Sequence, residues 1–131
     1  MLTICDTHIL IFWQDAPERL SINAAAAIEK GLKQKNLACS DISLWEIAML
    51  SASGRIRNDI PIDGYLNDLI TVLHLKVLPI NPEIAAISQS ELFTHKDPAD
   101  RLIAATAIHH NAPLITADRK LQGIQQINTI W

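Results

Sequence analysis

Four carboxylates in this sequence have the residue type and placement to hold a divalent cation. Asp6, Glu46, Asp100 and Asp118 each lie close to a junction between an apolar run and a predicted helix. Asp6 directly follows the apolar run LTIC, where a carboxylate is costly unless it is paired or bound to a cation. Oxygen ligands without a matching set of Cys and His favour Mg²⁺ or Mn²⁺ over Zn²⁺. These acids therefore predict a magnesium or manganese site.

Helix capping offers a structural explanation for part of the segment HKDPADRLIAATAI, residues 95–108. Pro98 suits the first position of a helix, which makes Asp97 the N-cap and places Asp100 at the third helical position. We therefore interpret Asp97 as a structural cap. Asp100 either complements the helix dipole or carries chemistry.

Glu46 and Asp118 have structural alternatives as well. If the helix that contains Glu46 starts at Ser43, the run SLWE is a capping box and Glu46 stabilises the helix start. If it starts at Ser40 or Asp41, Glu46 lies on the second turn and needs another role. Asp118 could equally serve as the N-cap of the helix that follows it.

The elements that must position these acids alternate between short apolar runs and helices. Strands are predicted at residues 2–5, 37–40, 77–80 and 113–116, and residues 127–131 offer a fifth. Helices are predicted at 8–13, 22–35 after the cap Ser21, 42–53 before Gly54, 64–74 after Asp63, 83–93 after Asn81 and Pro82, from 98 onward, and at 119–123. This order predicts an α/β fold with a mostly parallel central sheet of four or five strands flanked by helices. In such folds ligands bind at the carboxyl ends of the strands, which is where the four acids are expected.

Length and composition predict one compact domain that spans residues 1–131. Hydrophobic residues make up 49% of the chain and charged residues 19%, which argues against disorder. Neither a leader peptide nor a membrane span is evident at the apolar amino terminus, so we expect a soluble, cytoplasmic protein without a membrane partner. Cys5 and Cys39 lie in apolar runs and are predicted to be buried free thiols.

The overall charge does not indicate a nucleic-acid-binding protein. The formal net charge is -3, whereas a nucleic-acid binder usually has a basic face. Basic residues gather only in short groups near predicted junctions between loops and helices. These groups are Arg55 with Arg57, Lys96 with Arg101, and Arg119 with Lys120.

Four segments of the chain resemble, in order and spacing, the signature blocks of PIN domains, specifically the VapC-type toxins of bacterial toxin-antitoxin pairs. The segments are DTHILIFW, SDISLWEIAML, HKDPADRLIAATAI and PLITADRKL. The resemblance implies a Rossmann-like PIN domain with a Mg²⁺-dependent endoribonuclease site formed by Asp6, Glu46, Asp100 and Asp118. It also implies an RNA substrate, a cognate VapB-like antitoxin and a homodimer.

The mechanistic hypothesis assigns a role to each acid. Asp6 and Asp100 hold the principal metal, Glu46 orients or deprotonates a water, and Asp118 completes the set of ligands. The activated water attacks a phosphodiester in line and leaves a 5′-phosphate and a 3′-hydroxyl. Further polar residues are candidates for contacts with the acids or the substrate, and these are Thr7, Thr116, Arg101, Arg119 and His95.

Three other interpretations remain open for the same residues. One is a catalytically silent PIN-like module that only binds RNA or protein. Another is a phosphomonoester-processing enzyme, but a haloacid-dehalogenase-like site requires a second Asp at position 8, which is His. A metal-free ribonuclease needs a pair of histidines, and His109 and His110 lie at the far end of their helix from Asp100.

The large aromatic residues have a structural and a functional interpretation. Phe12, Trp13 and Trp45 are most simply core residues. The family resemblance offers an apolar groove for an antitoxin as the alternative, with an antitoxin arginine entering the acidic pocket.

Overall fold

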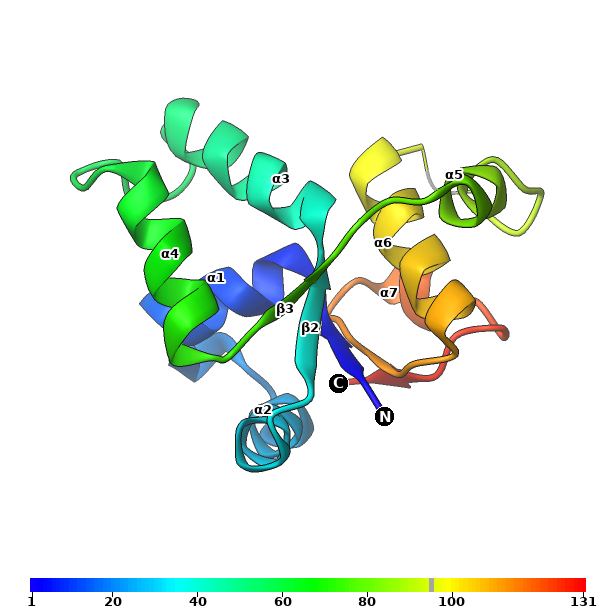
Figure 1. The fold of residues 1–131 in the computed structure, drawn as a ribbon, viewed down its shortest axis with the longest axis horizontal. Helices are drawn as coiled ribbons and strands as arrows, with labels where there is room; N and C mark the ends of the chain where they lie inside the picture. Colours follow the sequence, from blue (N-terminus) through cyan, green and yellow to red (C-terminus); the bar gives the residue numbers. More distant parts are fainter. Residues whose placement is uncertain (95) are drawn as a thin grey trace.

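The computed structural model describes residues 1–94 and 96–131, and they form three layers with a parallel sheet in the middle (Figure 1). The strands are β1 (Thr3–Cys5), β2 (Leu37–Ser40), β3 (Lys76–Leu78), β4 (Leu114–Ile115) and β5 (Thr129–Ile130). The helices are α1 (Thr7–Asp15), the 3-10 turn η1 (Pro17–Arg19), α2 (Ile22–Gln34), α3 (Asp41–Ala52), α4 (Ile62–Val72), α5 (Pro82–Ser88), α6 (Pro98–His110) and α7 (Arg119–Gln122). The predicted α/β class, with a mostly parallel sheet flanked by helices, is confirmed.

The order of the strands creates a crevice beside β1. All neighbours in the five-stranded sheet are parallel, and their order is β3-β2-β1-β4-β5. The chain moves from β1 to β2 and β3 on one side, then crosses to β4 and β5 on the other. Such a switch in direction separates the connections that leave neighbouring strands and opens a binding crevice at their carboxyl ends. Asp6 and Thr116 directly follow the two strands that flank this crevice.

Both faces of the central strands β1, β2 and β4 are largely buried, which explains why these strands are mostly apolar. Alternate side chains point to opposite faces: Cys5 and Ile115 join one core with α1 to α4, while Ile4 and Leu114 join a second core with α6. Figure 1 shows α1, α2 and α4 on one side of the sheet and α5, α6 and α7 on the other. The two cores fix the sheet rigidly beneath the crevice. Cys5 and Cys39 are buried and free, as predicted.

Several helix starts follow directly from local capping chemistry. The side chains of Ser21, Asn81 and Asp97 accept hydrogen bonds from backbone N–H groups of Ala24, Ile84 and Ala99, at 3.0, 2.8 and 2.9 Å. These three predicted caps are confirmed, as is Gly54 beyond the end of α3, where φ is +76°. The helix α4 begins at Ile62 and therefore already includes Asp63.

The alternative in which α3 starts at Ser43 and Glu46 belongs to a capping box is wrong. The helix α3 starts at Asp41, and the Ser40 hydroxyl accepts from the Ile42 N–H at 3.3 Å. Ser43 is fully buried, and its hydroxyl accepts a hydrogen bond from Thr7 at 2.9 Å. Glu46 therefore lies on the second turn of α3, and capping does not explain its presence.

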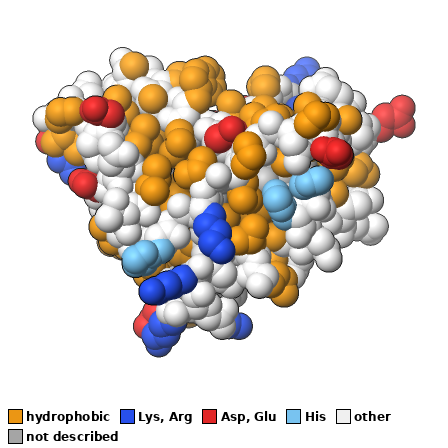
Figure 2. All heavy atoms as spheres, in the orientation of Figure 1, with side chains coloured by type: hydrophobic (Ala, Val, Ile, Leu, Met, Phe, Trp, Pro, Cys, Tyr) orange, Lys and Arg blue, Asp and Glu red, His pale blue; other side chains and the backbone are white. Residues whose placement is uncertain are grey.

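The prediction that Trp45 is a core residue is also wrong. Trp45 is 59% exposed, whereas Phe12 is buried and Trp13 packs against the core. The helix α3 buries Ser43 and Glu46 on the same side as the core residues Ile47 and Leu50, and it leaves Trp45 exposed. Figure 2 shows hydrophobic side chains gathered over the middle of the face that includes α3 and β3. Two polar side chains on the buried side of a helix depart from the usual apolar pattern and point to a site there.

Within residues 1–94 and 96–131, no helix combines the length and apolar character needed to cross a bilayer.

Candidate metal centre

The structure brings the four predicted acids together at the carboxyl edge of the sheet. A pocket of about 290 Å³ is lined by Asp6, Asp100 and Asp118, with Asp97 beside them. Carboxylate oxygens of Glu46, Asp97 and Asp100 lie within 4.8 Å of one another. Four predicted residues and one more, Asp97, thus form a single cluster, which we call the acid cluster.

Asp6 is held rigidly at the end of β1. It is buried, and its Oδ1 accepts from the Thr7 N–H at 2.7 Å as the N-cap of α1. Its Oδ2 accepts from the Thr116 hydroxyl, also at 2.7 Å. The same hydroxyl oxygen accepts from the Asp118 N–H at 3.0 Å, so Thr116 joins Asp6 to the loop after β4. These bonds leave Asp6 fixed in orientation and facing the pocket that Asp118 also lines.

Glu46 is a buried carboxylate that forms no ion pair within residues 1–94 and 96–131. It is 5% exposed, and its Oε1 has no hydrogen-bond partner among the described residues. Burial raises the pKa of Glu46, the neighbouring Thr7 hydroxyl opposes this, and the charges of Asp6 and Asp97 raise the pKa further. A buried charge without a partner costs several kcal/mol unless a cation compensates it. This oxygen therefore fits a ligand to a cation.

Asp100, in the first turn of α6, feels the charges of all the other acids of the cluster. Burial and then repulsion by nearby carboxylates raise its pKa to about 8. The carboxylates responsible are, in order of effect, Asp6, Asp97, Glu46 and Asp118. Burial likewise raises the pKa of Asp6, although the Thr116 hydrogen bond opposes the shift. Without a cation, Asp100 therefore stays largely protonated at neutral pH.

Asp97 belongs to the acid cluster, although we interpreted it from the sequence as a cap alone. Its Oδ1 does cap α6, through the Ala99 N–H. Its carboxylate also lies with those of Glu46 and Asp100. The signal was its spacing: residues at i and i+3 lie on the same side of a helical turn, so Asp97 had to face the same way as Asp100.

The donors of the acid cluster fit a hard divalent cation. They are carboxylate oxygens from four different segments, and Mg²⁺ and Mn²⁺ prefer such ligands. Positive charge at one point would give the unpartnered Oε1 of Glu46 a partner. The same charge would lower the raised pKa of Asp100. The arrangement could therefore bind a cation and present it, with its remaining positions open, to a phosphate group that enters the pocket.

The other predicted site residues occupy varied positions. Thr7 is buried, and its hydroxyl donates a hydrogen bond to the Ser43 hydroxyl. Arg101 points away toward α5, where its Nε donates to the Ser88 carbonyl at 2.9 Å. Arg119 is exposed at the start of α7, directly after Asp118, which caps that helix through the Lys120 N–H. Their substrate contacts stay predictions, and His95 lies outside the described residues.

Comparison with known proteins agrees with this geometry. The family model described as "PIN domain" matches residues 3–126. Ribonuclease VapC22 of Mycobacterium tuberculosis is 37% identical over 131 residues, which cover 98% of this chain and 97% of that protein.

Solved structures show the same fold. VapBC2 from Rickettsia felis, bound to a DNA fragment from their promoter, matches with a TM-score of 0.73 and 19% identity over 98% of this chain and 97% of that one. The DNA-bound VapBC from Salmonella typhimurium matches with a TM-score of 0.70 and 20% identity, again over 98% and 97% of the two chains. From the family model and the shared sequence, this chain belongs to the PIN domain family, among its VapC-type members.

Proposed function

We propose that this protein is a Mg²⁺-dependent endoribonuclease, and that Mn²⁺ can replace Mg²⁺. The observation that carries the proposal is the buried Glu46 carboxylate, with an orphaned oxygen beside Asp97 and Asp100. The 37% identity to a ribonuclease supports RNA as the substrate. A silent binding module would have no use for a buried and repelling set of carboxylates, which destabilises the fold.

The acids have distinct tasks in the proposed reaction. Asp6 and Asp100 would hold the cation, and Asp118 and Asp97 would complete the set of carboxylates around it. A cation bound there supplies positive charge that lowers the pKa of a water and stabilises the leaving oxygen. Glu46, whose carboxylate faces the acid cluster from the second turn of α3, orients the attacking water and accepts its proton.

The reaction exchanges one bond to phosphorus for another. The water oxygen bonds to phosphorus, and the bond from phosphorus to the 3′ oxygen breaks in line with the attack. The 3′ oxygen takes up a proton. The products are a 5′-phosphate and a 3′-hydroxyl.

An antitoxin is the proposed protein partner. The solved relatives include toxin-antitoxin complexes, and the acid cluster offers a charge-assisted site for a guanidinium. Beside it lies a groove of about 700 Å³ whose apolar wall includes Ile42, Trp45, Met49 and Leu102. An apolar tail of an antitoxin would cover the exposed Trp45 in this groove. The homodimer that the family resemblance implies stays a prediction.

Removal of metal tests the proposed function. In Mg²⁺, we expect cleavage of a structured RNA, and in EDTA no cleavage. Calorimetric titration with Mn²⁺ should show uptake by the protein, and a phosphomonoester such as p-nitrophenyl phosphate should remain intact. RNA cleavage that persists in EDTA, or release of p-nitrophenol, would contradict the assignment.

The Thr116 hydroxyl is predicted to position Asp6. In a Thr116→Val variant the hydroxyl is lost while the shape is nearly kept, so Asp6 loses one of its two hydrogen bonds. Loss of a partner that orients a metal ligand typically lowers metal affinity or activity about 10- to 100-fold. We expect that loss in Mn²⁺ affinity measured by calorimetry. Thr116→Ser keeps the hydroxyl and should retain near-normal affinity; equal losses in the two variants would show that the hydroxyl has no such role.

A further inference from the structure

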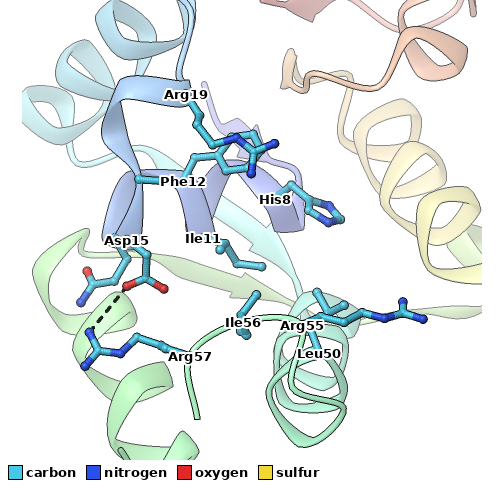
Figure 3. Close-up of a pocket in the computed structure, with 11 residues that line it drawn as sticks. His8, Ile11, Phe12, Asp15, Arg19, Leu50, Arg55, Ile56 and Arg57 are labelled. Atoms are coloured by element: carbon cyan, nitrogen blue, oxygen red, sulfur yellow. Dashed lines mark ion pairs between the residues drawn. The ribbon is translucent and has the colours of Figure 1, made fainter. Parts of the chain in front are cut away.

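A second hollow, of about 760 Å³, opens next to the acid cluster and differs from it in charge. It lies between α1, η1 and the segment that follows α3, and its lining includes Arg19, Arg55 and Arg57 (Figure 3). We call it the arginine cleft. His8 and Phe12 line both this cleft and the pocket of the acid cluster, so the two hollows are neighbours.

Arg57 contributes little positive charge to the cleft, because two carboxylates surround it. Its Nε and Nη2 donate to the two carboxylate oxygens of Asp59, each at 3.0 Å. Its Nη1 lies 3.8 Å from Oδ1 of Asp15, whose Oδ2 accepts from the Tyr65 hydroxyl. Figure 3 shows Arg57 turned toward Asp15 at one end of the cleft. Arg57 therefore ties the segment after α3 to α1.

Arg19 and Arg55 are different, because neither has an ion pair with any residue in the described part of the chain. The Arg19 guanidinium carbon lies 4.3 Å from the centroid of the Phe12 ring, which is itself buried. This contact holds the side chain in place and leaves N–H groups of the guanidinium able to donate elsewhere. Figure 3 shows Arg55 extending away from Arg57, toward the side of the cleft on which His8 lies.

We propose that the arginine cleft binds the sugar-phosphate backbone of the RNA strand beside the cleavage site, with Arg19 and Arg55 each contacting a phosphate. This proposal rests on the proposed ribonuclease function. The protein carries a net charge of -3 and its acid cluster is anionic, so long-range attraction does not bring RNA to the site.

Local cations must therefore offset that repulsion. The acid cluster, with its cation, takes the phosphate that reacts, and the neighbouring phosphates need positive groups of their own. The arginine cleft provides them in a hollow that shares His8 and Phe12 with the pocket. Contacts to phosphates are independent of sequence, so the cleft supplies affinity and orientation and leaves the choice of cleavage site to other contacts.

RNA binding in EDTA tests the cleft without cleavage. The probe is a fluorescent single-stranded RNA of about 12 nucleotides, and its anisotropy is measured between about 50 and 250 mM KCl. Wild-type protein is compared with Arg19→Gln, Arg55→Gln and the double variant. The control is Lys33→Gln, an exposed position on α2 outside the cleft. Each lost phosphate contact should weaken binding about 3- to 10-fold and reduce the slope of log affinity against log salt by about 0.7.

Further arms separate the possible outcomes. A double Arg→Lys variant keeps the charge and should retain the wild-type slope, whereas a misfolded protein would not. Mn²⁺ uptake should be unchanged in the Arg→Gln variants, because neither arginine lines the pocket of the acid cluster. Wild-type affinity and slope in the double Arg→Gln variant would overturn the proposal.

The failure of the cleft and the failure of the ribonuclease function are distinguishable. RNA binding that depends on Arg19 and Arg55 without any cleavage in Mg²⁺ would support the cleft and refute the ribonuclease. Normal cleavage and normal RNA binding by the double Arg→Gln variant would refute the cleft and support the ribonuclease. If the double variant loses binding to a polyglutamate peptide and keeps binding to RNA, the cleft is a protein site and the proposal is wrong.

Discussion

Cleavage of RNA by an Asp6→Asn variant is expected to fall by about 10²- to 10³-fold, the range found when one group that stabilises transition-state charge is removed. Asparagine can still accept from the Thr7 N–H, and its amide can donate to Thr116, so the fold should persist. What disappears is the charge and one oxygen ligand at the end of β1. The measurement is the initial rate of cleavage of a structured RNA in Mg²⁺, with circular dichroism to verify the fold.

A matched control for this prediction is available on α4. Asp68 is exposed and does not line the pocket of the acid cluster, so Asp68→Asn removes the same charge from the chain without touching the site. We expect wild-type cleavage by this variant. Equal rates for wild type and Asp6→Asn would remove Asp6 from the mechanism, and equal losses in both variants would indicate a general effect of charge.

Replacing Asp100 with asparagine is expected to stabilise the metal-free protein at alkaline pH and to abolish its stabilisation by Mg²⁺. Burial and then repulsion within the acid cluster raise the pKa of Asp100 to about 8 in the fold, against 3.8 for an aspartate in water. Between these two values the folded state binds more protons than the unfolded state. The free energy of unfolding therefore falls as pH rises through this window.

Thermal unfolding in EDTA between about pH 5.5 and 8.5 measures this effect, because ionisable groups shift stability with pH only where their pKa differs between states. The melting temperature of the wild type should drop more steeply with rising pH than that of Asp100→Asn. The difference in melting temperature between the two proteins should therefore shift in favour of the variant toward pH 8.5. Addition of Mg²⁺ at the alkaline end should raise the melting temperature of the wild type alone. Parallel pH profiles for the two proteins, or equal responses to Mg²⁺, would contradict this account.

Much of the fold could be predicted because its signals are local. Ser21, Asn81 and Asp97 cap their helices through backbone groups only a few residues away, so the sequence around each cap is sufficient. The meeting of Asp6, Asp100 and Asp118 followed from topology, since the carboxyl ends of parallel strands share one edge. The chain's resemblance to PIN domains added the function that these acids imply.

The features that sequence missed depend on contacts between distant segments. The start of α3 at Asp41 leaves Ser43 free to meet Thr7 across the sheet, and no local pattern indicates that pairing. The exposure of Trp45 follows from the same rotation of α3, which turns Glu46 toward the acids. Asp97 was assigned one role because its cap explained it fully, although its second role was implicit in its spacing from Asp100.

The hydrogen bond between Thr116 and Asp6 spans 110 positions of the chain and has a consequence for the order of assembly. Synthesis on the ribosome proceeds from the amino terminus, so Asp6 and Glu46 emerge well before Asp100 and β4. Until β4 docks beside β1, Asp6 has no Thr116 to orient it and the acids have no common centre. We therefore expect a nascent chain of this protein to be unable to cut RNA until its last strands are complete.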